Sequence, residues 1–357
     1  MKHIAIIGTQ GIPAQYGGFE SLVENLVKYR STSTITYTVF CSSKDLQTKI
    51  KTYNGITLRY IPLHANGTQS ILYDIYSLIL ARKNYDTILV LGVSGCIFLP
   101  IFCLFNHKKL LINIDGLEHK REKWNKAIKL FLRISEKFAI KYGSIIIADN
   151  KGIQDYVTKH YRRPSQLIAY GGDHALVKAQ GINEDKILNT YKLASNNYAI
   201  TICRIEPENN CHIILEAFKT NHKKLIFIGN WDRSDYGKNL RQKYSKYANI
   251  IMHPPIYDLN TLYVLRKNAS IYVHGHSAGG TNPSLVEAMF FGRPIIAYDV
   301  IYNRETTENK AIYFKDSISL NDIITATIDP QIGDLLHQIA LKRYTWEHIV
   351  KQYEELY

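Results

Sequence analysis

The sequence of 357 residues contains five cysteines, and their spacing matches neither a metal site nor a disulfide framework. They lie at positions 41, 96, 103, 203 and 211, with no CxxC pair and no Cys/His spacing of the zinc-binding type. Structural zinc and a disulfide scaffold are therefore not expected, and a reduced chain in the cytosol is the simplest interpretation. The first residues, MKHIAIIG, also lack the charged region, apolar core and cleavage site of a signal peptide, so export is not expected.

Low-complexity tracts and internal repeats are missing as well, which excludes disordered and repeat architectures. The 10 prolines and the 46% of hydrophobic residues are typical of a globular protein. A chain of this length exceeds what one hydrophobic core usually organises, so we expect two domains.

Long hydrophobic runs are scarce, and residues 88–105, ILVLGVSGCIFLPIFCLF, are the segment that approaches the length of a membrane span. Gly92, Gly95 and Pro100 interrupt this segment. We therefore predict a buried strand, a turn and a short apolar helix. A helix that faces a membrane without crossing it is the alternative.

The chain is strongly basic, with a net charge of +13 and a pI near 9.3, which favours an anionic partner. Cations recur at helical spacing on one face of a predicted helix at Lys126, Lys129, Arg133, Lys137 and Lys141. We expect the opposite face to be an apolar stripe of Ala127, Phe131, Ile134 and Phe138. Such a helix is either a solvated surface or a contact for anionic membranes. Nucleic acid is not expected as a partner, because the aromatic residues are scattered and no recognised binding motif is present.

Apolar runs of strand length alternate with helical periodicity along the chain, as in parallel-sheet α/β proteins. The first series covers residues 4–7, 37–40, 58–61, 88–91, 110–114, 145–148 and 167–170. The second covers residues 199–203, 225–228, 250–252, 271–273 and 295–298. We predict an α/β fold with two doubly wound, Rossmann-like domains, at residues 1–172 and 173–342, that face an interdomain ligand cleft. A final helix near residues 343–357 is expected to pack back on the first domain.

Each predicted domain contains a glycine-rich loop before a helix. In the first, GTQGIPAQYGGFE places Gly17 and Gly18 at a helix start, where backbone N–H groups favour an anion. In the second, GGTNPSLVEAM places Asn282 as N-cap and Pro283 as first helical residue. Glu287 lies one turn into that helix and can accept hydrogen bonds from sugar hydroxyls. Two such loops favour a ligand that carries both phosphate and sugar.

Four motifs in this order, GTQGIPAQYGGFE, DGLEHKREKW, CRIEPENN and GGTNPSLVEAM, resemble those of glycosyltransferase family 4, which has the GT-B fold. The similarity spans nearly the whole chain and is greatest to bacterial rhamnosyltransferases of capsule and O-antigen assembly. It implies transfer of a sugar, with rhamnose expected, from a dTDP- or UDP-sugar to a glycan linked to polyprenyl diphosphate. Retention of anomeric configuration and independence of metals and other cofactors are also implied, and the sequence contains no DxD motif.

The resemblance also implies roles by position. Arg204 matches a diphosphate-binding Arg, and Glu287 matches the second acid of a Glu-x7-Glu motif that holds the ribose. The residues expected to bind the donor are Gly17, Gly18, Arg204, Asn209, Ile256, Tyr257, Gly279, Gly280, Thr281, Asn282, Ser284 and Glu287. The first domain is expected to bind the acceptor and the second the nucleotide sugar.

The sequence departs from the family pattern at three positions. Gly279 stands where the first Glu of Glu-x7-Glu is usual, and Asn209 stands where a phosphate-binding Lys is usual. Asp115 takes the place of a His near the reacting sugar. One cation is thus missing from the expected diphosphate site, and Arg293 or the pair Lys120 and Arg121 are hypothetical replacements.

Asp115 is the first candidate catalytic residue, because it ends an apolar strand and is followed by Gly116. There its carboxylate would orient an acceptor hydroxyl, with a cap of the following turn as the alternative role. Glu118 is the competing carboxylate. The acceptor and membrane contacts are expected at Lys120, Arg121, Lys126, Lys129, Arg133 and Lys137. They imply a cytoplasmic enzyme attached peripherally to the inner face of the cell membrane. A nucleotide-sugar 2-epimerase of the same architecture, which needs no acceptor, is the alternative function.

Overall fold

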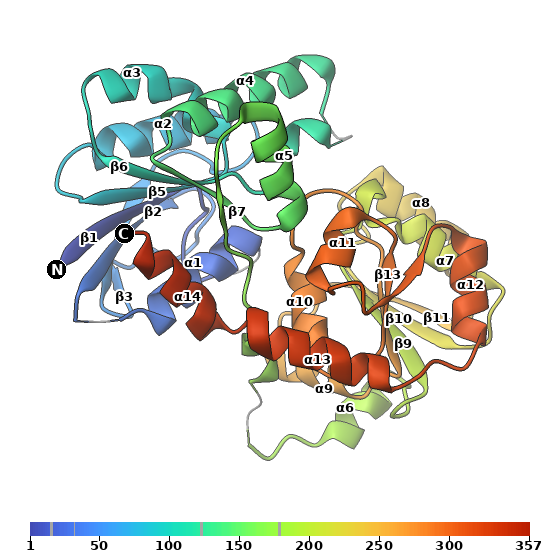
Figure 1. The fold of residues 1–357 in the computed structure, drawn as a ribbon. Coiled ribbons are helices and arrows are strands. Elements are labelled where there is room, and N and C mark those ends of the chain that lie inside the picture. The colour runs from blue at the N-terminus through green and yellow to red at the C-terminus, as the bar shows by residue number, and fades with distance from the viewer. Residues whose placement is uncertain (15–16, 32, 122–123, 178–179) are drawn as a thin grey trace. The chain divides into compact units, whose positions relative to one another are not determined.

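The computed structural model describes residues 1–14, 17–31, 33–121, 124–177 and 180–357 (Figure 1). The chain folds into two compact units, which are described separately. Unit 1 contains Met1–Tyr170 and Trp346–Tyr357, and unit 2 contains Gly171–Thr345. Four residues of the motifs above lie outside the described residues, namely Gln15, Tyr16, Glu122 and Lys123.

Unit 1 is built on an eight-stranded sheet in the order β3-β4-β2-β1-β5-β6-β7-β8, in which β3 and β4 pair antiparallel and the other neighbours pair parallel. Its strands are β1 (Lys2–Ile7), β2 (Ile35–Ser42), β3 (Thr52–Tyr53), β4 (Ile56–Ile61), β5 (Thr87–Leu91), β6 (Lys109–Asn113), β7 (Ile145–Ala148) and β8 (Gln166–Leu167). Its helices are α1 (Gly18–Tyr29), α2 (Gln69–Ala81), α3 (Leu99–Leu104), α4 (Lys126–Tyr142), α5 (Lys151–Tyr161) and α14 (Trp346–Glu355). Two 3-10 turns, η1 (Ser94–Phe98) and η2 (Glu118–Lys120), complete the unit.

The central strands of unit 1 are apolar along most of their length because helices cover both faces of the sheet (Figure 1). In β1, residues Ile4–Ile7 are fully buried. Helix α1 packs Leu22 and Leu26 into the same core, at positions one helical turn apart. Helix α14, from the end of the chain, adds Trp346 and Tyr353 to that core. The last residues of the sequence are therefore part of unit 1.

The apolar segment 88–105 forms β5, η1 and α3, which confirms the predicted strand, turn and short helix. Among the described residues, no helix is long and apolar enough to cross a membrane. Ile101, Leu104 and Phe105 at the end of this segment are nevertheless exposed.

Unit 2 contains a second parallel sheet, of six strands in the order β11-β10-β9-β12-β13-β14. Its strands are β9 (Tyr198–Ile202), β10 (Lys224–Ile228), β11 (Ile250–His253), β12 (Ile271–His274), β13 (Ile295–Tyr298) and β14 (Ile312–Phe314). Its helices are α6 (Glu184–Thr190), α7 (Cys211–Lys219), α8 (Asp235–Tyr244), α9 (Leu259–Lys267), α10 (Pro283–Met289), α11 (Ile301–Thr306), α12 (Ser317–Thr325) and α13 (Gln331–Arg343). The 3-10 turns are η3 (Asp173–Leu176) and η4 (Pro207–Asn209). The α/β fold with two doubly wound sheets is confirmed.

The ends of the two sheets and of the chain compare with the sequence prediction as follows. Strand β8 ends at Leu167 instead of residue 170, because this edge strand pairs with β7 over two residues only. Strand β14 was missed, since it is a three-residue edge strand without a long apolar run. The helix predicted near residues 343–357 is α14, which begins at Trp346, ends at Glu355 and packs on the core of unit 1 as expected.

Both sheets reverse their strand order at one point. From β1 the chain proceeds to β2 and β4 on one side, and then returns to β5 on the other. From β9 it proceeds to β10 and β11, and then returns to β12. In open α/β sheets, ligands bind outside the carboxyl ends of the two strands that flank such a switch point. The loops after β1, β5, β9 and β12 are therefore the candidate binding loops.

Candidate active site

The loop after β1 lies at the switch point of the unit 1 sheet. Gly8 and Gly11 have φ angles of +89° and +118°, and Gly17, the N-cap of α1, has a φ of +131°. A Cβ atom at Gly8 would lie 2.0 Å from the carbonyl oxygen of Leu91, at the end of the neighbouring strand β5. Glycine therefore allows the loop backbone to pass closely over the end of β5.

Glu20, in the first turn of α1, holds this loop in place. Its buried carboxylate accepts hydrogen bonds from Thr9 Oγ1 at 2.9 Å and from the Gln10 N–H at 2.8 Å. A Cβ atom at Gly17 would lie 1.9 Å from Glu20 Oε2. Burial raises the pKa of Glu20, and the nearby charge of Asp115 raises it further, although the two hydrogen bonds oppose this shift. Sequence reasoning missed Glu20, even though it ends the first quoted motif.

Asp115 lies at the same edge of the sheet, two residues after β6, and its charge reaches Glu20. Its φ of +57° is in the left-handed region, which residues other than glycine seldom adopt. The Asp115 N–H donates to Asn113 Oδ1 at 2.9 Å, and Asn113 Nδ2 donates to the Tyr353 hydroxyl at 2.8 Å. Helix α14 thus supports the turn that carries Asp115.

Glu118 is held by residues of its own segment. Its Oε1 forms an ion pair with Arg121 Nε at 2.8 Å, and its Oε2 accepts a hydrogen bond from Trp124 Nε1 at 3.2 Å. Because both carboxylate oxygens are engaged locally, this geometry favours a structural role for Glu118. The ion pair also engages the Arg121 guanidinium, one of the predicted acceptor contacts.

The predicted apolar stripe of α4 is wrong in part. The buried residues of α4 are Leu132, Ser135, Glu136, Ala139 and Ile140. Of the predicted stripe, Ala127 and Ile134 are exposed and Phe131 and Phe138 are half-buried. The basic residues Lys126, Arg133, Lys137 and Lys141 are exposed, whereas Lys129 is half-buried. The exposed face of α4 therefore carries cations and apolar side chains together.

Glu136 explains this rotation of the helix. Its carboxylate is buried and accepts hydrogen bonds from His119 Nδ1 at 2.9 Å, Tyr156 at 3.0 Å and Tyr161 at 2.7 Å. Burial alone would raise the pKa of Glu136, but these hydrogen bonds and the charge of His119 lower it below its usual value. The Lys120 ammonium lies 4.9 Å from the centre of the Tyr156 ring. Partners on η2 and α5 thus draw a charged residue of α4 inward.

In unit 2, the loops after β9 and β12 meet at the switch point through Asn209. Asn209 Nδ2 donates to the carbonyl oxygen of Arg204 at 2.7 Å, so Oδ1 is the amide atom that faces His276 Nδ1, also at 2.7 Å. His276 therefore carries its proton on Nδ1. A Cβ atom at Gly275 would lie 2.1 Å from the Asn209 carbonyl oxygen, which shows how closely the two loops pack. Arg204 is exposed at this edge.

Glu287 lies in α10, and its carboxylate is held between Arg266 of α9 and His174 of η3. Its Oε2 forms an ion pair with Arg266 of α9, and its Oε1 lies 3.3 Å from His174 Nε2. Burial would raise the pKa of Glu287, but Arg266 and His174 lower it below its usual value, so the carboxylate is ionised at neutral pH. Each carboxylate oxygen of Glu287 has a second lone pair that can accept a hydrogen bond from a ligand hydroxyl. Sequence reasoning missed His174, Arg266 and His276, because each acts through a contact distant in sequence.

The start of α10 has the predicted cap. Asn282 Oδ1 accepts a hydrogen bond from the Ser284 N–H at 3.0 Å, and Pro283 is the first helical residue. Gly279 has a φ of +92°, and Gly280 and Thr281 are buried before the helix. This confirms the predicted helix start after a glycine-containing loop.

Ile256 and Tyr257 follow β11, at the same edge of the sheet as Arg204. Strand β11 is separated from β9 by β10 alone, which corresponds to a distance of about 10 Å across the sheet. The Tyr257 side chain is 64% exposed.

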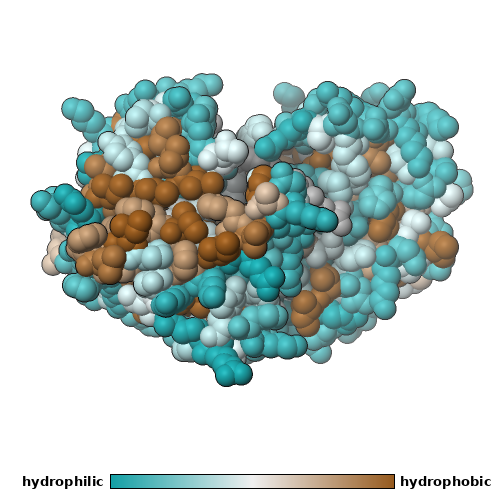
Figure 2. Space-filling model, turned by 90° about the horizontal axis from the view of Figure 1, so that it is seen from above, coloured by the Kyte–Doolittle hydropathy of each residue, from teal (hydrophilic) through white to brown (hydrophobic). Residues whose placement is uncertain are grey.

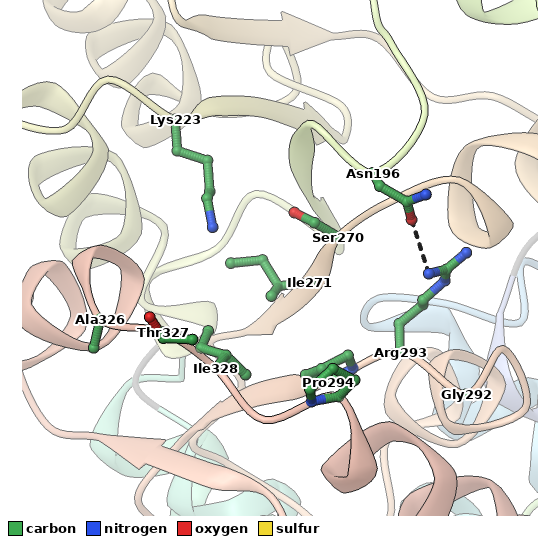
Figure 3. Close-up of a pocket in the computed structure, with 11 residues that line it drawn as sticks. Asn196, Lys223, Ser270, Ile271, Gly292, Arg293, Pro294, Ala326, Thr327 and Ile328 are labelled. Carbon is green, nitrogen blue, oxygen red and sulfur yellow. Dashed lines mark hydrogen bonds between the residues drawn. The ribbon is translucent and has the colours of Figure 1, made fainter.

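Arg293 does not belong to this edge. It precedes β13 and lies at the amino ends of the strands, in a pocket of about 370 Å³ (Figure 3). Its guanidinium donates to the carbonyl oxygen of Lys267 at 2.9 Å and to Asn196 Oδ1 at 2.9 Å. The loops after β9 and β12 lie at the opposite, carboxyl edge of the sheet. The hypothesis that Arg293 replaces the missing phosphate-binding cation is therefore wrong.

Within the described ranges, no group of three or more His, Cys, Asp or Glu residues is arranged to hold a metal ion. The cysteines Cys41, Cys96, Cys103, Cys203 and Cys211 are all free thiols. Independence of metals stays a prediction.

Models of known protein families match both parts of the chain. Residues 1–173 match a domain of unknown function, DUF1972. Residues 184–331 match the family Glycosyl transferases group 1. No match was found among curated proteins.

Solved structures of similar fold cover the whole chain. Sucrose-phosphate synthase from Thermosynechococcus elongatus is 16% identical, with a TM-score of 0.83 over 100% of this chain and 98% of that one. Anabaena HepE in complex with UDP-glucose is 17% identical, with a TM-score of 0.77 over 99% of this chain and 98% of that one. A putative UDP-N-acetylglucosamine 2-epimerase from Listeria monocytogenes is 14% identical, with a TM-score of 0.64 over 99% and 94% of the two chains. Residues 1–173 thus match the DUF1972 model, residues 184–331 match the Glycosyl transferases group 1 model, and the chain has the GT-B fold.

Proposed function

We propose that this protein is a retaining glycosyltransferase that moves a sugar from a nucleoside diphosphate to a glycan acceptor. The observation that carries the proposal is the pair of loops at the switch point of unit 2, where Asn209 joins the Arg204 loop to the His276 loop within the Glycosyl transferases group 1 domain. The complex of the similar HepE with UDP-glucose supports a nucleotide sugar as the donor.

The donor would bind along the carboxyl edge of the unit 2 sheet. We assign Arg204 to the diphosphate, because an exposed guanidinium pairs well with phosphate oxygens. Glu287, kept ionised by Arg266, would accept the ribose hydroxyls. The exposed Tyr257 and the neighbouring Ile256 would contact the base. Asn209 has no charge, so its assigned role is to fix the two loops rather than to neutralise phosphate.

Unit 1 would bind the acceptor. Asp115, on its left-handed turn beside Glu20, would accept a hydrogen bond from the attacking hydroxyl and orient it. In a retaining reaction at one face of the sugar, an oxygen of the leaving diphosphate takes the proton of that hydroxyl. The new glycosidic bond forms as the bond to the diphosphate breaks, and fixed donors stabilise the leaving charge. The proposed donor loop of unit 1 contains Gly17 and Gly18.

We further propose rhamnose as the sugar and a polyprenyl-diphosphate-linked glycan as the acceptor, in capsule or O-antigen synthesis. This part rests on the motif resemblance and on the charge of +13. Acceptors of this kind reside in a membrane, so the enzyme would attach peripherally to its cytoplasmic face. Lys120 and Arg121 are proposed contacts of the acceptor diphosphate, and the exposed cations of α4 are proposed contacts of the membrane.

Release of nucleoside diphosphate from a panel of dTDP-, UDP- and GDP-sugars, with and without a lipid-linked glycan, tests this function. We expect release from one donor only when the acceptor is present, and at least a tenfold weaker donor affinity for Arg204→Ala. Arg241→Ala is the matched control, because Arg241 makes an exposed ion pair with Asp232 at the surface of the same unit. Equal donor affinity in the two variants would contradict the assignment of Arg204.

A nucleotide-sugar 2-epimerase is the second candidate. The similarity in fold to the putative UDP-N-acetylglucosamine 2-epimerase is the reason to test it. Incubation with the donor alone decides between the two, because an epimerase converts the donor sugar without an acceptor.

A further inference from the structure

Unit 1 exposes a large apolar surface that its own fold leaves uncovered. It is formed by side chains of α2, of the segment that ends α3, and of α4, and we call it the three-helix surface. Its members are Leu72, Tyr76, Ile79, Ile101, Leu104, Phe105, Leu130 and Ile134. Figure 2 shows apolar side chains gathered in a broad patch on the side where α3 and α4 lie in Figure 1.

These side chains are not marginally exposed members of a core. Phe105 is 85% exposed, Leu104 is 72% exposed and Leu130 is 60% exposed. Helices α2, α3 and α4 are neighbours, because α3 packs on α4 and all three pack around η1. Soluble monomers seldom expose a broad contiguous apolar patch, so this surface indicates a partner.

A shallow groove runs between α2 and α3 within this surface. Its lining includes Ile79, Ile101 and Phe105, and the Arg82 side chain stands beside it. The groove has a volume of about 100 Å³, which is room for a few methylene groups.

The charged residues of the three helices are sorted by sign. Helices α2 and α4 each contain one carboxylate, Asp74 and Glu136, and α3 contains none. Both carboxylates are buried. The exposed charges on α4 are the cations Lys126, Arg133, Lys137 and Lys141, interspersed with Leu130 and Ile134. Within the described helices α2, α3 and α4, the exposed charges beside the apolar side chains are therefore cations, which is complementary to a layer of anionic headgroups over acyl chains.

We propose that the three-helix surface docks on an anionic lipid bilayer. Leu104 and Phe105 insert among the acyl chains, while Arg133 and Lys137 contact lipid phosphates. A second copy of the chain fits less well, because in a two-fold dimer the same surface faces itself and brings cations against cations. The inference rests on the proposed function in one respect, namely that the membrane is the place where the acceptor resides. The attachment proposed above uses the cations of α4 alone. The apolar contact is inferred separately, from the exposed apolar side chains of the three-helix surface.

Sedimentation of the full chain with vesicles of phosphatidylglycerol and phosphatidylcholine tests the proposal. We expect binding to mixed anionic vesicles and at least tenfold weaker binding for the double variant Leu104→Gln, Phe105→Gln. The matched control is Ile318→Gln with Leu335→Gln, which removes two exposed apolar side chains of unit 2 and should not change binding. Thermal melting of each variant confirms that the fold is intact.

Salt separates the apolar from the electrostatic contribution. If apolar insertion contributes, part of the binding persists in about 0.5 M NaCl, where charge attraction is screened beyond a few ångströms. Equal binding of the Leu104, Phe105 variant and the wild type would overturn the proposal. A vesicle-free dimer that the same variant dissociates would overturn it too, in favour of a second copy. Vesicle binding that persists while no nucleotide sugar is consumed would refute the proposed function and leave the lipid contact standing.

Discussion

Replacement of Gly17 by alanine tests the loop that opens the candidate site of unit 1. Gly17 has φ and ψ angles of 131° and 151°, a region that only glycine adopts readily, and alanine there costs about 1–3 kcal/mol. The added Cβ atom would lie 1.9 Å from Glu20 Oε2, so the carboxylate must move. Glu20 would then lose hydrogen bonds from Thr9 and Gln10, at about 1–3 kcal/mol for a buried group left unsatisfied. We expect a total destabilisation of about 3 kcal/mol or more, unless the loop shifts, in which case turnover is lost instead.

Gly67→Ala is the matched control for this experiment. Gly67 has a φ of +72°, and a Cβ atom there meets nothing within 4 Å. This variant therefore carries the cost of the left-handed backbone, about 1–2 kcal/mol, without the clash. Urea unfolding gives the change in free energy of unfolding, and nucleoside diphosphate release gives turnover. If Gly17→Ala matched Gly67→Ala in both measurements, the assigned role of the Glu20 carboxylate would be wrong.

Three further predictions concern buried or candidate catalytic carboxylates. Asp115→Asn should lower turnover at least about 100-fold and leave donor affinity unchanged. Glu118→Gln should lower turnover less than about tenfold, because the ion pair of Glu118 with Arg121 is local. If a steady-state assay gave the reverse order, the two roles would be exchanged. Burial raises the pKa of Asp74 to about 8, so the native state keeps a proton that the unfolded state loses above pH 4. Relative to Asp74→Asn, the free energy of unfolding should then fall by about 1.4 kcal/mol per pH unit between pH 4 and pH 8. If urea unfolding gave the two proteins the same dependence of stability on pH, this prediction would be contradicted. Glu287→Gln should destabilise the fold by about 3 kcal/mol at pH 7, because the nearly buried Arg266 loses its carboxylate. Because the pKa of Glu287 is lowered in the native state, the stability that its ion pair contributes is fully present above pH 4.5. In the wild type this stability is lost as the pH falls through the native-state pKa. Acid unfolding of the wild type and the variant measures the loss.

Local patterns predicted the elements that depend on neighbours in sequence. The buried strands followed from short apolar runs, and the start of α10 followed from Asn282 and Pro283. The division of residues 88–105 into strand, turn and helix followed from Gly92, Gly95 and Pro100. In each case the physical cause lies within a few residues of the element.

The failures share the opposite cause. The buried side of α4 could not be predicted from its periodicity, because Glu136 is drawn inward by His119 and by tyrosines of α5. The pairing of Asn209 with His276 spans 67 residues and has no local signal. Arg293 looked suitable as a basic residue near α10, but the strand order puts it at the amino edge of the sheet. Contacts across the sheet therefore decide which charged residues reach the site.

In the proposed reaction, the carboxyl edge of unit 2 binds a nucleotide sugar, and the sugar is transferred to an acceptor. The most direct measurement is nucleoside diphosphate release from a single donor, followed in parallel with and without a lipid-linked glycan acceptor. We expect release that depends on the acceptor, with the sugar recovered on the lipid-linked glycan. Conversion of the donor sugar without any acceptor, or no consumption of any nucleotide sugar in the panel, would contradict it.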